Sequence, residues 1–314
     1  MRKDKLTLES SHQIEFTGER FTPECVREIW YEHMHRYVLA GELTRGKTVL
    51  DAACGEGFGA HHLAIAASHV SAVDISQQTI EHACGRYRRD NLSFQVADCR
   101  TLPFADGQFD CIVSFETLEH LQDQSRMLRE FRRVLASDGF LLISSPDKAV
   151  YTEQLGNDNP FHLRELYRQE LEDLLAGEFP AVCLLGHKLA FHSMIWPLDP
   201  PAAGNPDRIS GLALHRQQDG VTSRLPGPGG DAVYHIALCA AEEKFLPQMG
   251  QQLWLFDDAA ESVYRHYQDE IRKNMQAGEI LQSRDREIET LQAALRELQD
   301  RPPRPWWRRL FGGL

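Results

Sequence analysis

Short runs of mostly apolar residues alternate with amphipathic segments through the middle of the chain. The runs have the composition of buried strands, and the segments between them place apolar residues every three or four positions, as helices do. This alternation is typical of an α/β fold, so we expect a doubly wound, seven-stranded and mostly parallel sheet with helices on both faces. The predicted strands are 47–52, 69–74, 92–97, 109–115, 139–145, 182–188 and 232–240. The predicted helices are 57–67, 76–88, 123–135 and 163–176.

The pattern changes at about residue 257, where apolar residues begin to recur at heptad spacing among charged residues and glutamines. This spacing predicts a coiled coil over 257–300 through which the chain self-associates, although Arg284 interrupts the seam. A single amphipathic helix that packs on the domain is the alternative. The heptad positions are filled by Leu281, Ile288 and Leu295, with Leu291 and Leu298 in the alternate core position.

A segment rich in proline and glycine, 197–231, separates the last two predicted strands. A connection of this length inside a domain is either functional or a tolerated insertion. We expect a loop that forms a flap on the substrate side, with a surface insertion as the alternative.

Composition and charge narrow the class of protein. The chain has 314 residues, 42% of them hydrophobic, and a formal net charge of −12 that argues against broad nucleic-acid binding. Its seven cysteines form no C-x-x-C pair, so we interpret them as reduced thiols. Neither a signal peptide nor an apolar stretch long enough to span a bilayer is evident. These features together predict a cytoplasmic protein.

The last fourteen residues, 301–314, combine four arginines with two tryptophans and a phenylalanine, and contain no acid. Arginine and tryptophan together favour the headgroup boundary of an anionic membrane. We therefore expect a peripheral contact at the inner membrane face. A frayed end or a docking peptide for a protein partner is the alternative.

The strand at 47–52 runs into Asp51 and three glycines at alternate positions, Gly55, Gly57 and Gly59. Glycines here let the backbone turn sharply and approach a ligand closely at the start of a helix. Dinucleotide-binding proteins use G-x-G-x-x-G at this place, and an acid ahead of the glycines would repel a pyrophosphate. The spacing D-x-x-x-G-x-G-x-G therefore argues against a dehydrogenase and suits a ligand with a positively charged amino-acid end.

Two more acids follow the next predicted strands. Asp74 ends the strand at 69–74, and Asp98 follows the apolar run at 92–97. Because the carboxyl ends of parallel strands meet at one edge of a sheet, we expect these two acids and Asp51 to form a row that binds one ligand.

These motifs resemble those of class I S-adenosylmethionine-dependent methyltransferases, whose fold is Rossmann-like, over roughly residues 15–240. The resemblance implies that S-adenosylmethionine is the cofactor and that the last strand of the sheet lies antiparallel. It implies that Asp51 and the glycines hold the methionine end, and that Asp74 takes the ribose hydroxyls. It also implies that Asp98 and the backbone beside Cys99 contact the adenine amino group.

Residues 1–46 precede this domain, which we place at 47–241. They contain G-E-R-F-T-P-E at 18–24 and E-H-M-H-R-Y at 32–37, an arrangement that resembles methyltransferases found with bacterial polysaccharide and O-antigen assembly enzymes. The resemblance implies a short arm and a helix that forms a lid over the cofactor, with Arg36 as a further cofactor ligand. A purely structural helix is the alternative.

Methyl transfer to a hydroxyl requires that the acceptor lose a proton, so a base is expected near the end of the fourth strand. Glu116, Glu119 and His120 follow this strand at i, i+3 and i+4, on one face of a predicted helical turn. In one interpretation His120 is the general base, tuned by a glutamate. In another, these residues and His162 bind a divalent metal, Mg²⁺ or Mn²⁺, that holds the acceptor. In a third, they only cap and solvate a turn.

The metal interpretation rests on a resemblance of its own. The pattern E-x-x-E-H with a later histidine is similar to metal-binding segments of small-RNA 3′-end methylases and of O-methyltransferases of the ubiquinone pathway. Arg164 and Glu165, close to the later histidine, are expected to help position an anionic or hydroxyl-rich acceptor.

The resemblance to polysaccharide methyltransferases implies transfer of a methyl group to a sugar hydroxyl of a lipid-linked glycan, capping O-antigen or polysaccharide chains. The coiled coil and the tail would then place the enzyme beside a glycosyltransferase or polymerase at the membrane. One alternative is methylation of a quinone or another small phenolic lipid. The other is a coiled-coil scaffold that recruits glycosyltransferases.

Overall fold

The computed structural model describes residues 28–195, 214–218, 221–225, 231–250 and 252–300. These residues divide into two compact units, one ending at Phe256 and the other beginning at Asp257. The first unit holds a mixed sheet and the candidate site, and the second holds one long helix. The arm motif and the arginine-rich tail lie outside the described residues.

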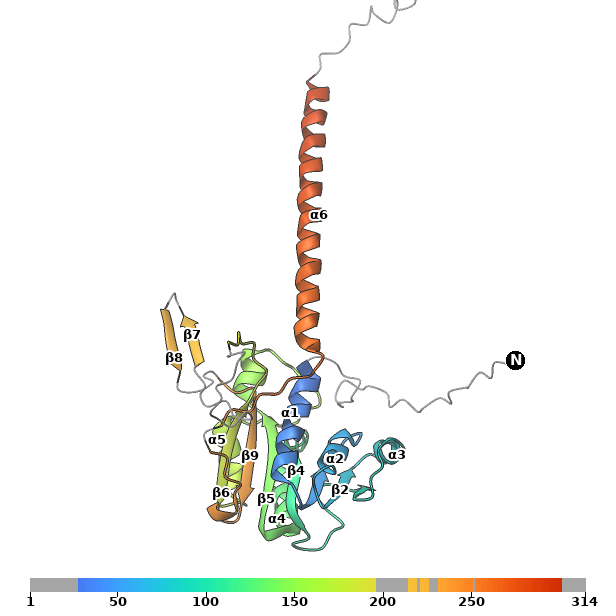
Figure 1. Ribbon diagram of the computed structural model, residues 1–314, viewed down its shortest axis with the longest axis vertical. Coiled ribbons are helices and arrows are strands. Elements are labelled where there is room, and N and C mark those ends of the chain that lie inside the picture. Colours follow the sequence, from blue (N-terminus) through green and yellow to red (C-terminus); the bar gives the residue numbers. More distant parts are fainter. Residues whose placement is uncertain (1–27, 196–213, 219–220, 226–230, 251, 301–314) are drawn as a thin grey trace, which may run out of the picture. The chain divides into compact units, whose positions relative to one another are not determined.

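The first unit is built on a seven-stranded sheet in the order β3-β2-β1-β4-β5-β9-β6 (Figure 1). Neighbouring strands from β3 to β5 pair in parallel, whereas β9 is antiparallel to both β5 and β6. The predicted mostly parallel sheet and its antiparallel last strand are thus confirmed. The strands are β1 (Thr48–Ala52), β2 (His69–Asp74), β3 (Leu92–Val96), β4 (Phe109–Ser114), β5 (Leu135–Pro146), β6 (Ala181–His187) and β9 (Tyr234–Ala240).

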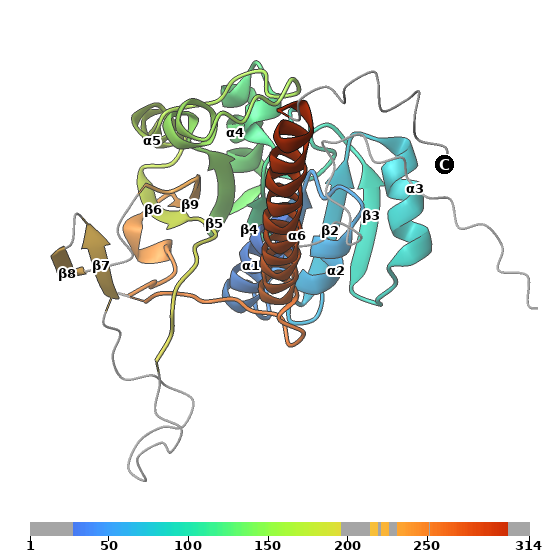
Figure 2. The same cartoon turned by 90° about the horizontal axis from the view of Figure 1, so that it is seen from above.

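Helices cover both faces of the sheet, as predicted. Apolar residues of α1, α2 and α3 pack in one buried cluster, and those of α4 and α5 pack in a second cluster on the other face. Figure 2 shows α4 and α5 across the sheet from α1 and α2. The helices are α1 (Glu28–Leu43), α2 (Phe58–Leu63), α3 (Gln77–Arg86), α4 (Gln124–Val134) and α5 (Arg168–Ala176).

Side-chain caps explain where two of these helices begin. Ser76 Oγ accepts the N–H of Thr79 at the start of α3, and Asp123 Oδ1 accepts the N–H of Arg126 at the start of α4. Such caps satisfy N–H groups that have no partner within the helix. Both helices accordingly begin within one residue of the predicted start.

Helix α5 begins later than predicted, and the difference bears on the site. The N–H groups of Leu163 and Arg164 both donate to the carbonyl oxygen of Glu119, at 2.9 and 3.0 Å. Leu166 then pairs with Asp147 in an isolated β-bridge. Because these backbone groups bond to other segments, the chain does not turn into a helix here, and it lies against the turn that carries Glu119.

Helix α2 is shorter than predicted. It ends at Leu63, and the side-chain amide of Asn91 donates to the carbonyl oxygens of Ala64 and Ala67 at 2.9 and 3.0 Å. Carbonyls at a helix end need partners from outside the helix, and here a distant asparagine supplies them.

The proline-rich segment at 197–231 contains a hairpin where it is described. Strand β7 (Leu214–Gln218) pairs antiparallel with β8 (Val221–Leu225). The dipeptide between them in the sequence, Asp219-Gly220, is typical of a two-residue hairpin turn. The expectation of a loop is therefore wrong for these strands, while their role at a substrate stays a prediction.

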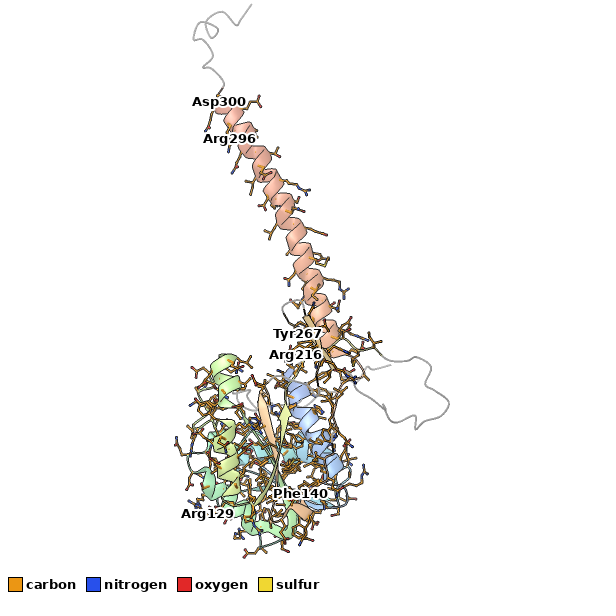
Figure 3. All side chains as sticks on the ribbon, turned by 90° about the vertical axis from the view of Figure 1, so that its left-hand side faces the viewer. Arg129, Phe140, Arg216, Tyr267, Arg296 and Asp300 are labelled. Carbon is orange, nitrogen blue, oxygen red and sulfur yellow. The ribbon has the colours of Figure 1, made fainter. Side chains whose placement is uncertain are left out.

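The second unit contains α6 (Ser262–Gln299), whose side chains project on all sides of the helix (Figure 3). The predicted helix is confirmed. Four heptad residues, Leu281, Ile288, Leu291 and Leu295, are 50 to 64% exposed, and self-association through them stays a prediction. Across the described part of the chain, every helix is too short or too polar to cross a lipid bilayer.

Candidate active site

The backbone after strand β1 turns through three left-handed residues. Ala53, Gly55 and Gly57 have φ angles of 61°, 55° and 94°. Such angles suit glycine, and at Ala53 they store strain of the kind found at functional sites. Gly57 is required for a second reason, because a Cβ there would lie 2.8 Å from the ring of Phe94. The shape of this glycine loop therefore depends on the absence of a side chain at position 57.

Asp51 lies near the carboxyl end of β1 and is completely buried. The hydroxyl of Tyr37 donates to its Oδ1 at 3.1 Å. Burial raises the pKa of the Asp51 carboxyl to about 7, while the hydrogen bond from Tyr37 lowers it and the charge of Asp74 raises it. A buried carboxyl with this pKa ionises readily when a cation approaches, which is the property that an ammonium-binding site needs.

Asp74, at the end of β2, ties the glycine loop to the neighbouring strand. Its Oδ2 accepts the N–H of Gly55 at 3.1 Å, and its Oδ1 accepts the N–H of Ser76 at 2.9 Å. Asp98, beyond β3, is held by Arg100, whose Nε and Nη2 donate to it at 2.9 and 2.7 Å. Because β1, β2 and β3 are neighbours in the sheet, the three predicted acids follow one another along one edge. Their roles toward a cofactor stay predictions.

Gly59 and Cys99, two further residues predicted at the cofactor, are buried. Burial raises the pKa of the Cys99 thiol to about 12, so the thiol stays protonated. A Cβ at Gly59 would lie 2.0 Å from the ring of Tyr37. The missing side chain thus allows α1 to approach α2, and this close packing brings the Tyr37 hydroxyl to Asp51.

Arg36 projects from α1 into the interior, with 1% of its surface exposed. Its Nη1 lies 3.4 Å from Nδ1 of His187 and 3.7 Å from Oε1 of Glu116, and its guanidinium lies 4.9 Å from the ring centre of Tyr234. Burial and the charge of Arg36 lower the pKa of His187 to about 3, so His187 is neutral. Nε of Arg36 has no hydrogen-bond partner among the described residues. A buried donor of this kind suits a ligand carboxylate.

Glu116 does not lie on the helical turn that the spacing predicted. Its φ of 50° is left-handed, and a 3₁₀ turn begins only at Leu118 and ends at His120. The N–H of Glu116 donates to Ser144 Oγ at 3.1 Å, and the Ser144 hydroxyl donates to Glu116 Oε1 at 2.6 Å. This carboxylate therefore faces β5 and Arg36, and the i, i+3, i+4 arrangement is wrong for Glu116.

Glu119, His120 and His162 do converge. One ligand atom from each lies within 4.8 Å of the others, and Nε2 of His120 is 3.9 Å from Oε1 of Glu119. Glu119 is completely buried, and neither carboxylate oxygen has a hydrogen-bond partner among the described residues. Burial raises the pKa of Glu119 well above its usual range, and the charges of Glu116 and Glu165 add to this. A buried carboxyl without partners is costly unless a ligand or cation satisfies it.

The two histidines are oriented by their other ring nitrogens. Nδ1 of His120 lies 3.1 Å from the carbonyl oxygen of Phe161, which only accepts hydrogen bonds, so this nitrogen carries the proton. Nδ1 of His162 lies 2.5 Å from Oε1 of Glu165, whose other oxygen accepts from the Thr152 hydroxyl. In the neutral form of each histidine, Nε2 then presents a lone pair. Histidines held in this way by a carbonyl or carboxylate are typical of metal ligands.

A polar cavity of about 360 Å³ adjoins these residues. Tyr151, which lines it, sits on a π-helix (Ala149–Gln154) and its ring centre lies 5.5 Å from that of His162. Such π-helical turns occur frequently at functional sites. The cavity, called here the acceptor pocket, is lined by Tyr151, Asn157, Asp158, Asn159, Pro160 and Phe161.

Several residues of this site were not predicted from the sequence. Glu32 accepts from the Tyr234 hydroxyl at 3.4 Å, and burial raises the pKa of its carboxyl. Burial also raises the pKa of Tyr151, together with the charges of four carboxyls. Tyr37 stands beside Arg36 in the E-H-M-H-R-Y segment, so its place in that motif was a usable signal. The four carboxyls that act on Tyr151 are Glu116, Glu165, Glu119 and Glu32.

Comparison with known proteins agrees with these features. Residues 50–143 match the methyltransferase domain family. A probable S-adenosylmethionine-dependent methyltransferase of Mycobacterium tuberculosis is 39% identical over 168 residues, which are 52% of this chain and 60% of that protein. Phosphoethanolamine N-methyltransferase of Triticum aestivum is 37% identical over 146 residues, which are 42% of this chain and 28% of that enzyme.

Among solved structures, the YcgJ protein of Bacillus subtilis matches with a TM-score of 0.44 and 25% identity, over 50% of this chain and 71% of that one. The match to the mycobacterial relative covers less than two thirds of the length of that protein.

Proposed function

Because residues 50–143 form a class I S-adenosylmethionine-dependent methyltransferase domain, we propose that the whole chain transfers a methyl group to a sugar hydroxyl of a lipid-linked glycan. The observation that carries the proposal is the convergence of Glu119, His120 and His162 beside a polar pocket. These groups are suited to activating a hydroxyl.

The residues at the end of β1 fit the cofactor. When bound, S-adenosylmethionine supplies a methyl group on a sulfonium, and an in-line nucleophile needs little further help. Asp51 offers a buried carboxyl to the ammonium group, and Arg36 offers its unpaired Nε to the carboxylate. Charge-assisted bonds of this kind are roughly twice as strong as neutral ones.

Two chemistries are open to the acceptor hydroxyl. Two imidazole lone pairs and one carboxylate are a ligand set for a divalent cation, and a cation there would lower the pKa of the hydroxyl. Because Glu116 faces Arg36 instead, the set has one carboxylate fewer than predicted and the same two nitrogen ligands, which favours Mn²⁺ over Mg²⁺. Alternatively, Nε2 of His120 takes the proton directly as a general base.

The charge around the acceptor favours a neutral substrate over phosphoethanolamine, the substrate in the name of the wheat relative. Four carboxyls act on Tyr151, and Arg36 is the one described cation that pairs with one of them. Those of these carboxyls that are ionised repel a phosphate group. A sugar hydroxyl or a phenol escapes this repulsion.

The lining of the acceptor pocket supports a sugar over a quinone or another phenolic lipid. Asn157, Asp158 and Asn159 present amide and carboxylate groups, which pair with several hydroxyls at once. The ring of Phe161, 42% exposed, offers an apolar face beside them. A phenolic lipid would displace water from these polar groups and offer them fewer hydrogen bonds in return. It stays the second candidate because Glu119, His120 and His162, called here the triad, would serve a phenol equally well.

The remaining parts of the chain support a place at a membrane. We expect α6 to form the coiled coil and residues 301–314 to contact anionic lipid at the inner membrane face, where the enzyme would meet a glycosyltransferase or polymerase and cap its polysaccharide. A pure scaffold that recruits glycosyltransferases is less well supported, since it leaves the glycine loop and the buried Asp51 without a purpose.

Transfer of labelled methyl from S-adenosylmethionine to a lipid-linked glycan extract, with and without EDTA, tests the proposal. We expect label in the glycan fraction, less label in the presence of EDTA, and loss of label in Glu119→Gln. The matched control is Glu42→Gln, which changes an exposed residue of α1. Label confined to a quinone or phenol fraction would show that the acceptor is a phenolic lipid and not a sugar. Label in no fraction would contradict transferase activity on these substrates.

A further inference from the structure

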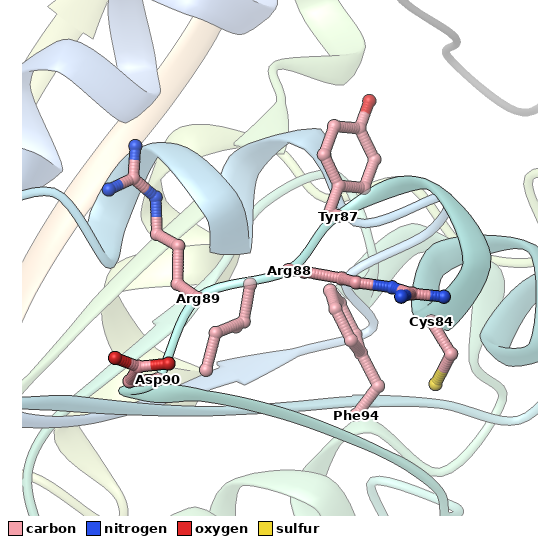
Figure 4. A pocket seen from close by; sticks show the side chains of 7 residues that line it. Cys84, Tyr87, Arg88, Arg89, Asp90 and Phe94 are labelled. Carbon is pink, nitrogen blue, oxygen red and sulfur yellow. The ribbon is translucent and has the colours of Figure 1, made fainter.

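A second cavity, of about 320 Å³, opens where α3 ends and the edge strand β3 begins (Figure 4). It contains no residue of the triad or of the acceptor pocket. We call it the edge pocket. Its lining residues are Cys84, Tyr87, Arg88, Arg89, Asp90, Leu92 and Phe94.

The edge pocket carries an excess of positive charge in a chain whose net charge is −12. Arg88 and Arg89 line it together with one carboxylate, Asp90, and Figure 4 shows the two guanidinium groups pointing to different sides. Neither arginine pairs with an acid in the described part of the chain, whereas Arg86 beside them pairs with Glu56. Two cations next to one acid favour an anionic ligand.

Two histidines of α2 extend the basic surroundings. Burial, followed by the charge of Arg89, lowers the pKa of His61, and burial, the charge of His61 and the charge of Arg89 lower the pKa of His62, so all three groups lie close enough to interact. The ring of His61 also lies 5.1 Å from that of Tyr87. Neutral imidazoles can donate hydrogen bonds to an anion without adding charge.

The rest of the lining is apolar. Leu92 and Phe94 are partly buried residues of β3, and Figure 4 shows the rings of Tyr87 and Phe94 together with the Arg88 side chain around the cavity. An apolar wall beside a guanidinium group fits a flat ring that carries a phosphate or sulfonate, because the ring covers Phe94 while the anion meets an arginine.

Two contacts join this pocket to the glycine loop. The Tyr87 hydroxyl donates to Oε1 of Glu56 at 2.7 Å, and Glu56, 1% exposed, stands between the two left-handed glycines of the loop. The ring of Phe94 packs where a Cβ of Gly57 would be. Tyr87 and Phe94 therefore have one side on the edge pocket and the other on the loop expected to hold the cofactor.

We propose that the edge pocket is an effector site for an anion on an apolar ring, coupled to the glycine loop through Tyr87 and Phe94. A ligand that holds these two rings in place restricts the loop, so cofactor and effector bind cooperatively. Linkage requires each to change the affinity of the other by the same factor. The coupling part rests on the proposed cofactor site, whereas binding of the anion does not.

Calorimetry of the full chain with phenyl phosphate tests binding. We expect the wild type to bind, and Arg88→Ala combined with Arg89→Ala to raise the dissociation constant about tenfold or more. Arg45→Ala, which removes an exposed arginine elsewhere in the first unit, is the matched control and should bind normally. No binding by the wild type, or equal binding by the double variant, would overturn the site.

A second titration tests the coupling. We expect saturating phenyl phosphate to tighten S-adenosylhomocysteine binding at least about fivefold. Tyr87→Phe keeps the ring but loses the bond to Glu56, so it should bind phenyl phosphate while the coupling shrinks. An unchanged or weakened S-adenosylhomocysteine affinity in the wild type would overturn the effector role. Failure of S-adenosylhomocysteine to bind at all would instead overturn the proposed function.

Discussion

The hydroxyl of Tyr37 lies 3.1 Å from Oδ1 of Asp51, so the N-terminal helix and the central strand share a hydrogen bond in the buried interior. Burial raises the pKa of the Asp51 carboxyl, and this hydrogen bond lowers it. The position of α1 therefore acts directly on the group expected to hold the ammonium end of the cofactor. Any change that moves α1 should alter cofactor affinity as well as stability.

Replacing Asp51 by asparagine should stabilise the protein without cofactor. The pKa of Asp51 is raised from 3.8 to about 7, so the ionised form opposes folding, and stability falls as pH rises between these values. We expect Asp51→Asn to gain up to about 4 kcal/mol of unfolding free energy at pH 8 and nothing at pH 4. It should also abolish S-adenosylhomocysteine binding. Thermal unfolding at both pH values checks this, and a less stable variant at pH 8 would contradict the buried charge.

Binding of Mn²⁺ decides how the triad works. We expect calorimetry to detect Mn²⁺ binding in the wild type and none in Glu119→Gln, because the buried carboxylate is lost. His120→Ala should keep S-adenosylhomocysteine binding but lower turnover by about 10² to 10⁴. If the wild type binds no Mn²⁺ and His120→Ala still loses turnover, His120 is the general base. Near-normal turnover in His120→Ala would remove it from the chemistry.

Gly59→Ala should destabilise the first unit by about 1–3 kcal/mol, because the new Cβ would lie 2.0 Å from the Tyr37 ring and α1 must shift. The matched control is Gly85→Ala in α3, where nothing lies within 4 Å of the new Cβ. That change should stabilise by about 0.5–1 kcal/mol. Urea unfolding measures both changes in the free energy of unfolding. An unchanged value for Gly59→Ala would show that α1 can shift without loss of stability.

A charge in the heptad seam should separate the copies of the chain. We expect Ile288→Lys to convert the oligomer to a monomer, since a buried lysine in a coiled-coil core is costly. Ala293→Lys, which lies between the heptad positions, should leave the assembly intact. Sedimentation equilibrium distinguishes the two. A wild type that is already monomeric would refute the coiled coil.

Deleting residues 301–314 should abolish co-sedimentation with anionic liposomes, because this segment holds four arginines and two tryptophans. Neutral liposomes are the control and should bind weakly before and after the deletion. If the shortened chain still sediments, the membrane contact lies elsewhere in the protein.

The places of the sheet strands along the chain and the identity of the glycine loop could be predicted, because short apolar runs and the spacing of glycines depend on local sequence. The dipeptide Asp219-Gly220 is an equally local hairpin signal, but the prolines of the surrounding segment favoured a loop, so β7 and β8 were not predicted. The start of α5 was not predictable in this way, since it depends on the Glu119 carbonyl, far away in the sequence. For the same reason the spacing grouped Glu116 with Glu119, while a left-handed backbone and Ser144 separate them.

Strand β9 is the last strand of the sheet to be synthesised, yet it lies between β5 and β6. Strands β1 to β5 can pair as soon as each leaves the ribosome, whereas β6 has no neighbour in the sheet until Tyr234–Ala240 emerges. In this register Tyr234 stands opposite His187, and Arg36 reaches both. The glycine loop can therefore form during translation, while the surroundings of Arg36 must wait for nearly the whole first unit.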